Sequence, residues 1–163
     1  MPSFLRPVLF AALFSASAVF AENTATTPAP RDANWVKRHE GLVAESKAKK
    51  DNVDLLFLGD SITDGWDNAG KMVYDKYYVP RNVLNLGIGG DRTQHVLWRL
   101  QNGEVDGLHP KVTVLLIGIN NTPIRKDESQ NNTAPEIIEG VTAVVKEIQT
   151  RMPKTKVLLL AVF

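Results

Sequence analysis

The chain has 163 residues, a length that accommodates one ordinary domain and is too short for two. With 44% hydrophobic and 23% charged residues, it has the composition of a folded globular protein rather than of a disordered segment. The net charge of +1 provides no basic field for a nucleic-acid partner, and the lack of cysteine excludes disulfides, zinc-thiolate sites and a cysteine nucleophile.

The first 21 residues have the pattern of a secretory signal peptide. Arg6 precedes a wholly apolar run from Val8 to Phe14, and small residues ending at Ala18 or at Ala21 offer two cleavage sites. The alternative, an uncleaved membrane anchor, is disfavoured because the run is shorter than the roughly 20 residues that span a bilayer. We therefore expect a secreted or periplasmic protein, with no integral membrane span after cleavage.

Residues 22–34 are rich in Thr, Pro and Ala and have no hydrophobic period. Such a composition is typical of a linker or an extended arm. We therefore expect a flexible arm over residues 22–34 and a single domain over residues 35–163.

Four short apolar runs in this domain predict the strands of one sheet. Continuous runs bounded by Gly, Pro or Asn suit strands that are buried on both faces of a parallel sheet. The runs are Val53–Leu58, Val83–Leu86, Val112–Ile117 and Val157–Val162.

Helical patterns lie between the strands, at residues 35–50, 93–101 and 134–151. The last is the strongest, because Pro135 begins it, Pro153 follows it, and apolar residues recur at three-to-four spacing. These residues are Ile137, Ile138, Val141, Val144, Val145 and Ile148. The alternation predicts an α/β sandwich of three layers, with the chemistry at the carboxyl ends of the strands.

The loop after the first strand contains Ser61, behind Gly59 and Asp60. A serine at a turn from a strand towards a helix is exposed in a fixed geometry, as a nucleophile requires. The alternative is an N-cap serine, which is common at such turns.

The loop after the second strand contains three glycines, Gly87, Gly89 and Gly90, which allow the backbone to approach a ligand closely. A dinucleotide fingerprint would require Gly or Ala at position 92, which is Arg92, and no P-loop motif occurs. Gly87 and Gly89 suit a tight turn, whereas Gly90 is the better candidate for a functional N–H.

Asn120 and Asn121 follow the third strand, which is otherwise apolar. An asparagine amide at this place donates to an oxyanion without adding charge, although asparagine is also a common turn residue.

These residues resemble the SGNH, or GDSL, hydrolases. Gly59-Asp60-Ser61-Ile62, Gly90 and Gly118-Ile119-Asn120 match the first three blocks of that family. Residues 85–100 (NLGIGGDRTQHVLWRL), with residues 101–104 and 109–111, are similar to the branch related to platelet-activating-factor acetylhydrolase catalytic subunits. The resemblance covers residues 53–163.

The resemblance implies a flavodoxin-like three-layer α/β/α sandwich and a serine esterase that acts through an acyl-enzyme, without a metal or cofactor. It implies Ser61 as the nucleophile, and the Ser61 and Gly90 N–H groups with the Asn120 side-chain amide as the oxyanion hole. The substrates are expected to be short-chain esters of carbohydrates or lipids. Asp60 and Trp66, beside the nucleophile, are candidates for the substrate pocket.

The general base is absent from this pattern. The family places it in an Asp-x-x-His block near the C-terminus, and none of His39, His95 and His109 has that context. His95 is a possible substitute, although a structural role is favoured. Because the chain stops inside an apolar run, we expect it to be a truncated fragment of a longer hydrolase.

Two further functions stay open at this point. One is a pseudoenzyme that binds acylated glycans or lipids without turnover, because the base is missing. The other is a nucleotide-binding module that uses the glycine loop at residues 87–90.

Overall fold

The computed structural model describes residues 22–123 and 131–162, so the signal peptide predicted for residues 1–21 lies outside the described residues. The helices are α1 (Ala33–Lys49), α2 (Ser61–Asp64), α3 (Lys71–Tyr77), α4 (Thr93–Gln101) and α5 (Ala134–Arg151). The strands are β1 (Leu55–Gly59), β2 (Val83–Gly87), β3 (Val112–Leu116) and β4 (Lys156–Leu159). In these described ranges, five short 3-10 turns precede or connect these elements, among them η1 (Thr24–Thr26) and η5 (Ile119–Asn121).

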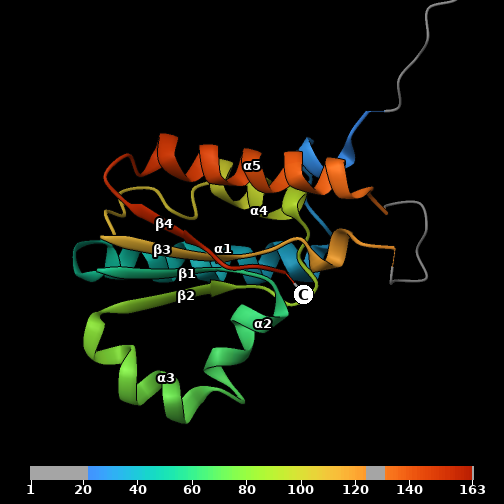
Figure 1. The fold of residues 1–163 in the computed structure, drawn as a ribbon. Helices are drawn as coiled ribbons and strands as arrows, with labels where there is room; N and C mark the ends of the chain where they lie inside the picture. Colours follow the sequence, from blue (N-terminus) through green and yellow to red (C-terminus); the bar gives the residue numbers. More distant parts are fainter. Residues whose placement is uncertain (1–21, 124–130, 163) are drawn as a thin grey trace, which may run out of the picture.

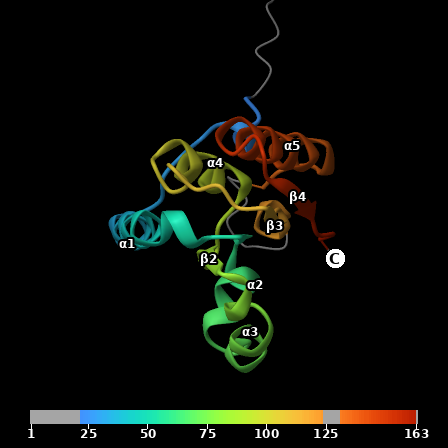
Figure 2. The same ribbon diagram turned by 90° about the vertical axis from the view of Figure 1, so that its left-hand side faces the viewer.

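The four strands form one parallel sheet in the order β2-β1-β3-β4. Helices α4 and α5 cover one face, and α2 and α3 lie on the opposite face near β2 and β1 (Figure 1). Helix α1 lies on the β2 side, between the two helical layers (Figure 2). This architecture confirms the predicted three-layer α/β sandwich.

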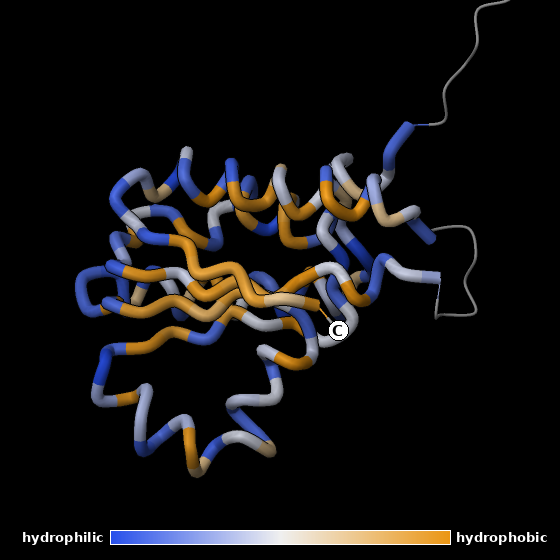
Figure 3. Tube along the Cα trace, in the orientation of Figure 1, coloured by the Kyte–Doolittle hydropathy of each residue, from blue (hydrophilic) through white to orange (hydrophobic). Residues whose placement is uncertain are grey.

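The hydrophobic core lies between the sheet and the α4–α5 layer, and Figure 3 shows the apolar stretches that the strands and α5 contribute to it. Leu56, Leu58, Leu84 and Leu86 of β1 and β2 are fully buried. The helices predicted at residues 93–101 and 134–151 have the predicted bounds. The Thr133 and Glu136 side chains form a capping box at the start of α5, which explains that sharp boundary.

The structure differs from the prediction of a flexible arm at residues 22–34. Ala25 is fully buried, its carbonyl accepts a hydrogen bond from Thr93 Oγ1, and the Ala29 N–H donates to the Gln94 carbonyl. A methyl group at Gly140 of α5 would lie 2.8 Å from the Ala25 oxygen, so the lack of a side chain there allows the arm to pack. The arm is therefore part of the fold, and α1 begins two residues earlier than predicted.

The prediction of burial on both faces is wrong for β4. Leu159, on the α5 side, is about half exposed at the edge of the described sheet, and Leu158 is about half exposed on the opposite face, where α2 and α3 reach only β2 and β1. A cavity of about 330 Å³ opens over this face, between the α2 side and β4. Ile138 of α5, predicted to be on the apolar face of the helix, is also exposed.

Helix α3 has no apolar pattern that predicts it from the sequence. Its Tyr74 packs on Phe57 of β1, with ring centres 6.1 Å apart, so the helix is anchored by aromatic contacts rather than by an apolar period. In the ranges that the structure describes, no helix is long and apolar enough to cross a membrane.

Candidate active site

Three loops that follow parallel strands meet at one edge of the sheet. In the strand register, Gly59 of β1 lies opposite Gly87 of β2 and Leu116 of β3. Because the strands are parallel, the segments after these residues leave the sheet on the same side. The structure therefore brings together the loops that carry the predicted serine, glycine and asparagine.

Ser61 is the first residue of the one-turn helix α2 and is exposed to solvent. The N-cap of this helix is Asp60, whose buried carboxylate accepts a 3.0 Å hydrogen bond from the Ile62 N–H. The alternative role of Ser61 as an N-cap is therefore wrong. An exposed hydroxyl at the start of a helix has the placement that a nucleophile needs.

Gly89 and Gly90 form a turn beside Ser61. A methyl group at Gly89 would lie 3.8 Å from Ser61 Cβ, and Gly90 has a φ of +80°, which disfavours any other residue. No acceptor for the N–H of Ser61 or Gly90 is found among the described residues. Both groups are therefore available to a bound oxyanion.

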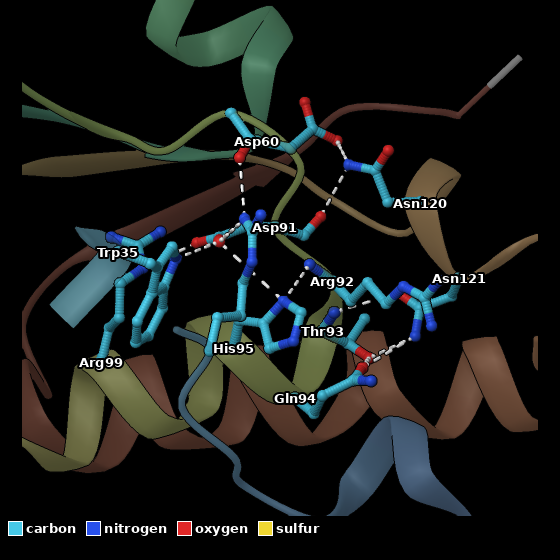
Figure 4. A network of polar contacts seen from close by, with 12 residues as sticks. Trp35, Asp60, Asp91, Arg92, Thr93, Gln94, His95, Arg99, Asn120 and Asn121 are labelled. Atoms are coloured by element: carbon cyan, nitrogen blue, oxygen red, sulfur yellow. Dashed lines mark hydrogen bonds and ion pairs between the residues drawn. The ribbon is translucent and has the colours of Figure 1, made fainter. Parts of the chain in front are cut away.

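Asn120 lies in the η5 turn after β3 and is 5% exposed. Its Nδ2 donates to the Asp91 carbonyl at 2.7 Å and lies 3.5 Å from the Asp60 carboxylate (Figure 4). The amide thus bridges the loops after β1 and β2. Because Nδ2 carries two hydrogens, the one on the long Asp60 contact is the donor that a bound oxyanion could take over.

The oxyanion roles of Ser61, Gly90 and Asn120 stay predictions, although the loops that carry these residues converge. Trp66 and Ser61 line the same open depression of about 320 Å³, which keeps Trp66 as a pocket candidate. Asp60 is fully buried and holds the turn, so its contact with a substrate also stays a prediction.

The Asp91 carboxylate, just before α4, is fully buried and pairs with Arg99. The N-cap of α4 is Arg92, and the buried Asp91 carboxylate lies 2.9 Å from Nε of Arg99. Burial raises the pKa of Asp91 to about 6, whereas Arg99 and Trp35 act in the opposite direction. Burial alone would lower the pKa of Arg99, but the Glu104 and Asp91 carboxylates raise it, so Arg99 is charged.

The sequence reasoning missed Arg99. This residue lies three positions after Val96 on the buried face of α4 and is itself fully buried. A charged residue between the apolar Val96 and Leu100 of a predicted buried helix was the available signal, because such a residue is rarely buried without partners.

His95 does not act as a base in this arrangement. Its Nδ1 accepts a 3.0 Å hydrogen bond from the Arg92 N–H. Burial, with the positive charges of Arg31, Arg92 and Arg99, lowers the pKa of His95 to about 3. An imidazole of such low basicity is a poor acceptor for a serine proton, so the favoured structural role of His95 agrees with its contacts.

The other two histidines lie away from Ser61. His39 Nε2 lies 3.2 Å from the Asn102 carbonyl, and its ring stacks on Trp35. Asp106 and His109 have Asp-x-x-His spacing, but they precede β3 and therefore lie at the amino ends of the strands. Among the described residues, no histidine is placed to take the proton of Ser61.

The low pKa of His95 predicts a contribution to stability that is lost in acid. The unfolded imidazole binds a proton below about pH 6.5, whereas the folded one does so only near pH 3. The free energy of unfolding should therefore fall by about 3 kcal/mol between pH 6.5 and pH 4 on account of His95. His95→Asn, which keeps an acceptor for the Arg92 N–H, should remove this loss in urea titrations across the pH range.

Asp91 lies 3.9 Å from His95, and its raised pKa works in the opposite sense over the same pH range. The comparison of His95→Asn with the parent therefore isolates the histidine. His109→Asn, at an exposed position, is the matched control and should follow the parent curve. Parallel curves for the parent and His95→Asn would contradict the prediction.

Residues 57–163 match the sequence profile of the GDSL-like Lipase/Acylhydrolase family. Platelet-activating factor acetylhydrolase IB subunit alpha2 of Homo sapiens is 39% identical over 129 residues, covering 79% of this chain and 51% of that protein. Subunit alpha1 of Bos taurus is 36% identical over 144 residues, covering 85% and 57%. The chain thus spans about half the length of the curated relatives it matches.

Solved structures show the same fold at low sequence identity. The acetyl xylan esterase AlAXEase is similar with a TM-score of 0.52 and 23% identity, over 64% of this chain and 56% of that chain. A GDSL-like lipase from Bacteroides thetaiotaomicron gives a TM-score of 0.51 and 19% identity, over 74% and 56%.

Proposed function

The chain belongs to the GDSL-like lipase/acylhydrolase family, and we propose that it hydrolyses carboxylic esters through an acyl-enzyme on Ser61. The Ser61 oxygen attacks the acyl carbonyl, its proton passes to a general base, and the alcohol leaves with a proton. Water then attacks the acyl-serine and releases the acid. The base is the histidine that the family resemblance implies in an Asp-x-x-His block.

One observation carries this proposal: an exposed serine begins α2 beside two backbone N–H groups that have no acceptor among the described residues. The tetrahedral intermediate places a negative oxygen where such donors are needed. The Asn120 amide, held between the same loops, is the third donor.

The substrates that we propose are short-chain esters of carbohydrates or lipids outside the cytoplasm. Two similarities support a small acyl group, since one relative is named an acetylhydrolase and one similar structure an acetyl xylan esterase. The signal-peptide pattern at residues 1–21 supports export.

A fluorophosphonate probe tests the proposed nucleophile directly. The protein, made as its gene encodes it, is expected to form one covalent adduct, and peptide mass spectrometry should place it on Ser61. An adduct on another residue, or none while ester turnover is measurable, would argue against Ser61.

A second candidate function is the binding of acylated glycans or lipids without turnover. It is favoured by one observation, that no described histidine is placed at Ser61. Calorimetry with acetylated xylo-oligosaccharides would then give binding, while the acetate concentration stays constant over hours.

Trp66 offers a test of acyl selectivity. Its ring packs on Phe57 and Tyr78, and its edge reaches the depression beside Ser61. Trp66→Ala should lower kcat/KM for p-nitrophenyl butyrate about 10-fold and for the acetate less than about threefold, because methylene contacts of about 1 kcal/mol each are lost.

The control for this prediction is Tyr77→Ala, which removes a half-exposed aromatic ring from the neighbouring helix α3. Thermal unfolding of both variants defines an assay temperature at which each is folded. If Trp66→Ala lowered kcat/KM equally for the butyrate and the acetate, Trp66 would only pack within the fold and would not contact the acyl group.

A further inference from the structure

A cluster of charged side chains is fully buried beneath the candidate active site. Asp91, Arg99 and Glu104 each have no solvent exposure. Charged groups are seldom buried in this way, because the loss of their hydration is offset only by well-formed contacts. The cluster lies directly under the loops after β1 and β2, so its contacts can fix the positions of those loops.

Arg99 holds the ends of both strands. Its Nη1 donates to the Leu86 carbonyl at 2.8 Å, and its Nη2 donates to the Gly59 carbonyl at 3.3 Å. Gly59 lies two residues before the proposed nucleophile, and Leu86 lies at the end of β2. A planar guanidinium with several donors thus fixes the separation of two loops that carry oxyanion donors.

Asp91 connects this guanidinium to the glycine loop. Its Oδ2 pairs with Arg99 Nε at 2.9 Å, and its Oδ1 accepts from Trp35 Nε1 at 2.7 Å and lies 3.4 Å from Arg31 Nη1 (Figure 4). Donors from the arm, α1 and α4 therefore hold one carboxylate. Arg31 also donates to the Gly89 carbonyl at 2.8 Å, which fixes the same loop from outside.

The backbone of Asp91 connects this buried cluster to two of the proposed oxyanion donors. Its carbonyl accepts the Asn120 Nδ2 hydrogen bond at 2.7 Å, and its neighbour is Gly90. The direction of the Gly90 N–H and the place of the Asn120 amide therefore both depend on where the Asp91 backbone lies.

We propose that Asp91, clamped by Arg99, is a positioning residue that aims the Gly90 N–H and the Asn120 amide at one point. This inference rests on the proposed esterase function. A misplacement of such donors by a few tenths of an ångström weakens the transition state more than substrate binding, because the oxyanion forms only during reaction. Loss of the carboxylate should therefore appear in kcat.

The experiment compares Asp91→Asn with Glu104→Gln in the protein as its gene encodes it. Glu104 accepts two hydrogen bonds from Arg99 Nη1, at 2.6 and 2.7 Å, and no contact of its side chain with the three site loops is found among the described residues. Both changes neutralise one buried carboxylate on the same guanidinium. We expect Asp91→Asn to lower kcat for p-nitrophenyl acetate about 30-fold, with KM within threefold, and Glu104→Gln to change kcat less than threefold.

The rate of fluorophosphonate labelling gives a second readout, since the phosphoryl oxygen occupies the same hole. It should fall in Asp91→Asn in parallel with kcat. Where Asp91→Asn does not fold, Trp35→Phe replaces it, because this change keeps an aromatic ring and removes the Nε1 donor. We expect Trp35→Phe to lower kcat about fivefold.

Three outcomes overturn the positioning role. They are a kcat within twofold of the parent in Asp91→Asn, an equal loss in Glu104→Gln, or, where Asp91→Asn does not fold, a kcat within twofold in Trp35→Phe. The failure of the proposed function is a different result, in which Ser61→Ala turns over esters at more than about one tenth of the parent rate.

Discussion

Ser61→Ala is expected to lower kcat for ester hydrolysis by at least about 10³-fold, with little change in KM. In the proposed mechanism the hydroxyl forms the acyl bond, so without it the remaining groups provide only a weak, non-covalent route. The effect on stability should be small, because Ser61 is exposed and Asp60, rather than Ser61, caps α2. Initial rates with p-nitrophenyl acetate and urea unfolding measure the two quantities.

The matched control is Thr150→Ala, which removes an exposed hydroxyl from α5. In the described chain, the only hydrogen bond of this hydroxyl is to the Lys146 carbonyl. The variant should have the kcat of the parent. Turnover in Ser61→Ala above about one tenth of the parent rate would reject the acyl-enzyme mechanism, and with it the role of Ser61.

The strands and the two best-defined helices could be predicted because their signals are local. Apolar runs of four to six residues mark β1 to β3, and Pro135 with the Thr133–Glu136 capping box marks the start of α5. The loops of the site followed from the same reasoning, since parallel strands place what comes after them at one edge.

The features that could not be predicted depend on tertiary contacts. The arm has no period, and its order comes from bonds such as Ala29 N–H to the Gln94 carbonyl, 65 positions away in the sequence. Burial of β4 on both faces was expected from its composition, but composition does not show that β4 is an edge strand. The role of Arg99 likewise depends on partners from β1, β2 and the glycine loop.

Asn120 and Asn121 are adjacent, equally polar and both buried, yet their contacts differ. Asn121 Oδ1 accepts from the Thr93 N–H at 3.0 Å, and its Nδ2 contacts Gln94 and Asn132 oxygens at 3.0 Å. These bonds join η5 to α4 and to the segment before α5. Asn121 therefore joins elements of the fold, whereas Asn120 is predicted to donate to the oxyanion.

Asn120→Ala is expected to lower kcat about 100-fold and to leave KM within threefold, because one oxyanion donor is lost. Its cost in stability should be about 1 kcal/mol, since the Asp91 carbonyl loses a single donor. Asn121→Ala should show the converse. Its free energy of unfolding should fall by about 3 kcal/mol, because several buried partners are left unpaired. Its kcat should stay within threefold of the parent at a temperature where the variant is folded.

Comparing the two variants distinguishes a catalytic role of the buried Asn120 from a purely structural one. If Asn120 only held the turn, both substitutions would lower stability and kcat together, and activity would return on cooling. If Asn120 donates to the oxyanion, its loss lowers kcat at every temperature at which the protein is folded, and fluorophosphonate labelling of Ser61 slows by a similar factor. Equal kcat values for the two folded variants would remove the Asn120 amide from the proposed oxyanion hole and leave only the Ser61 and Gly90 N–H groups as donors.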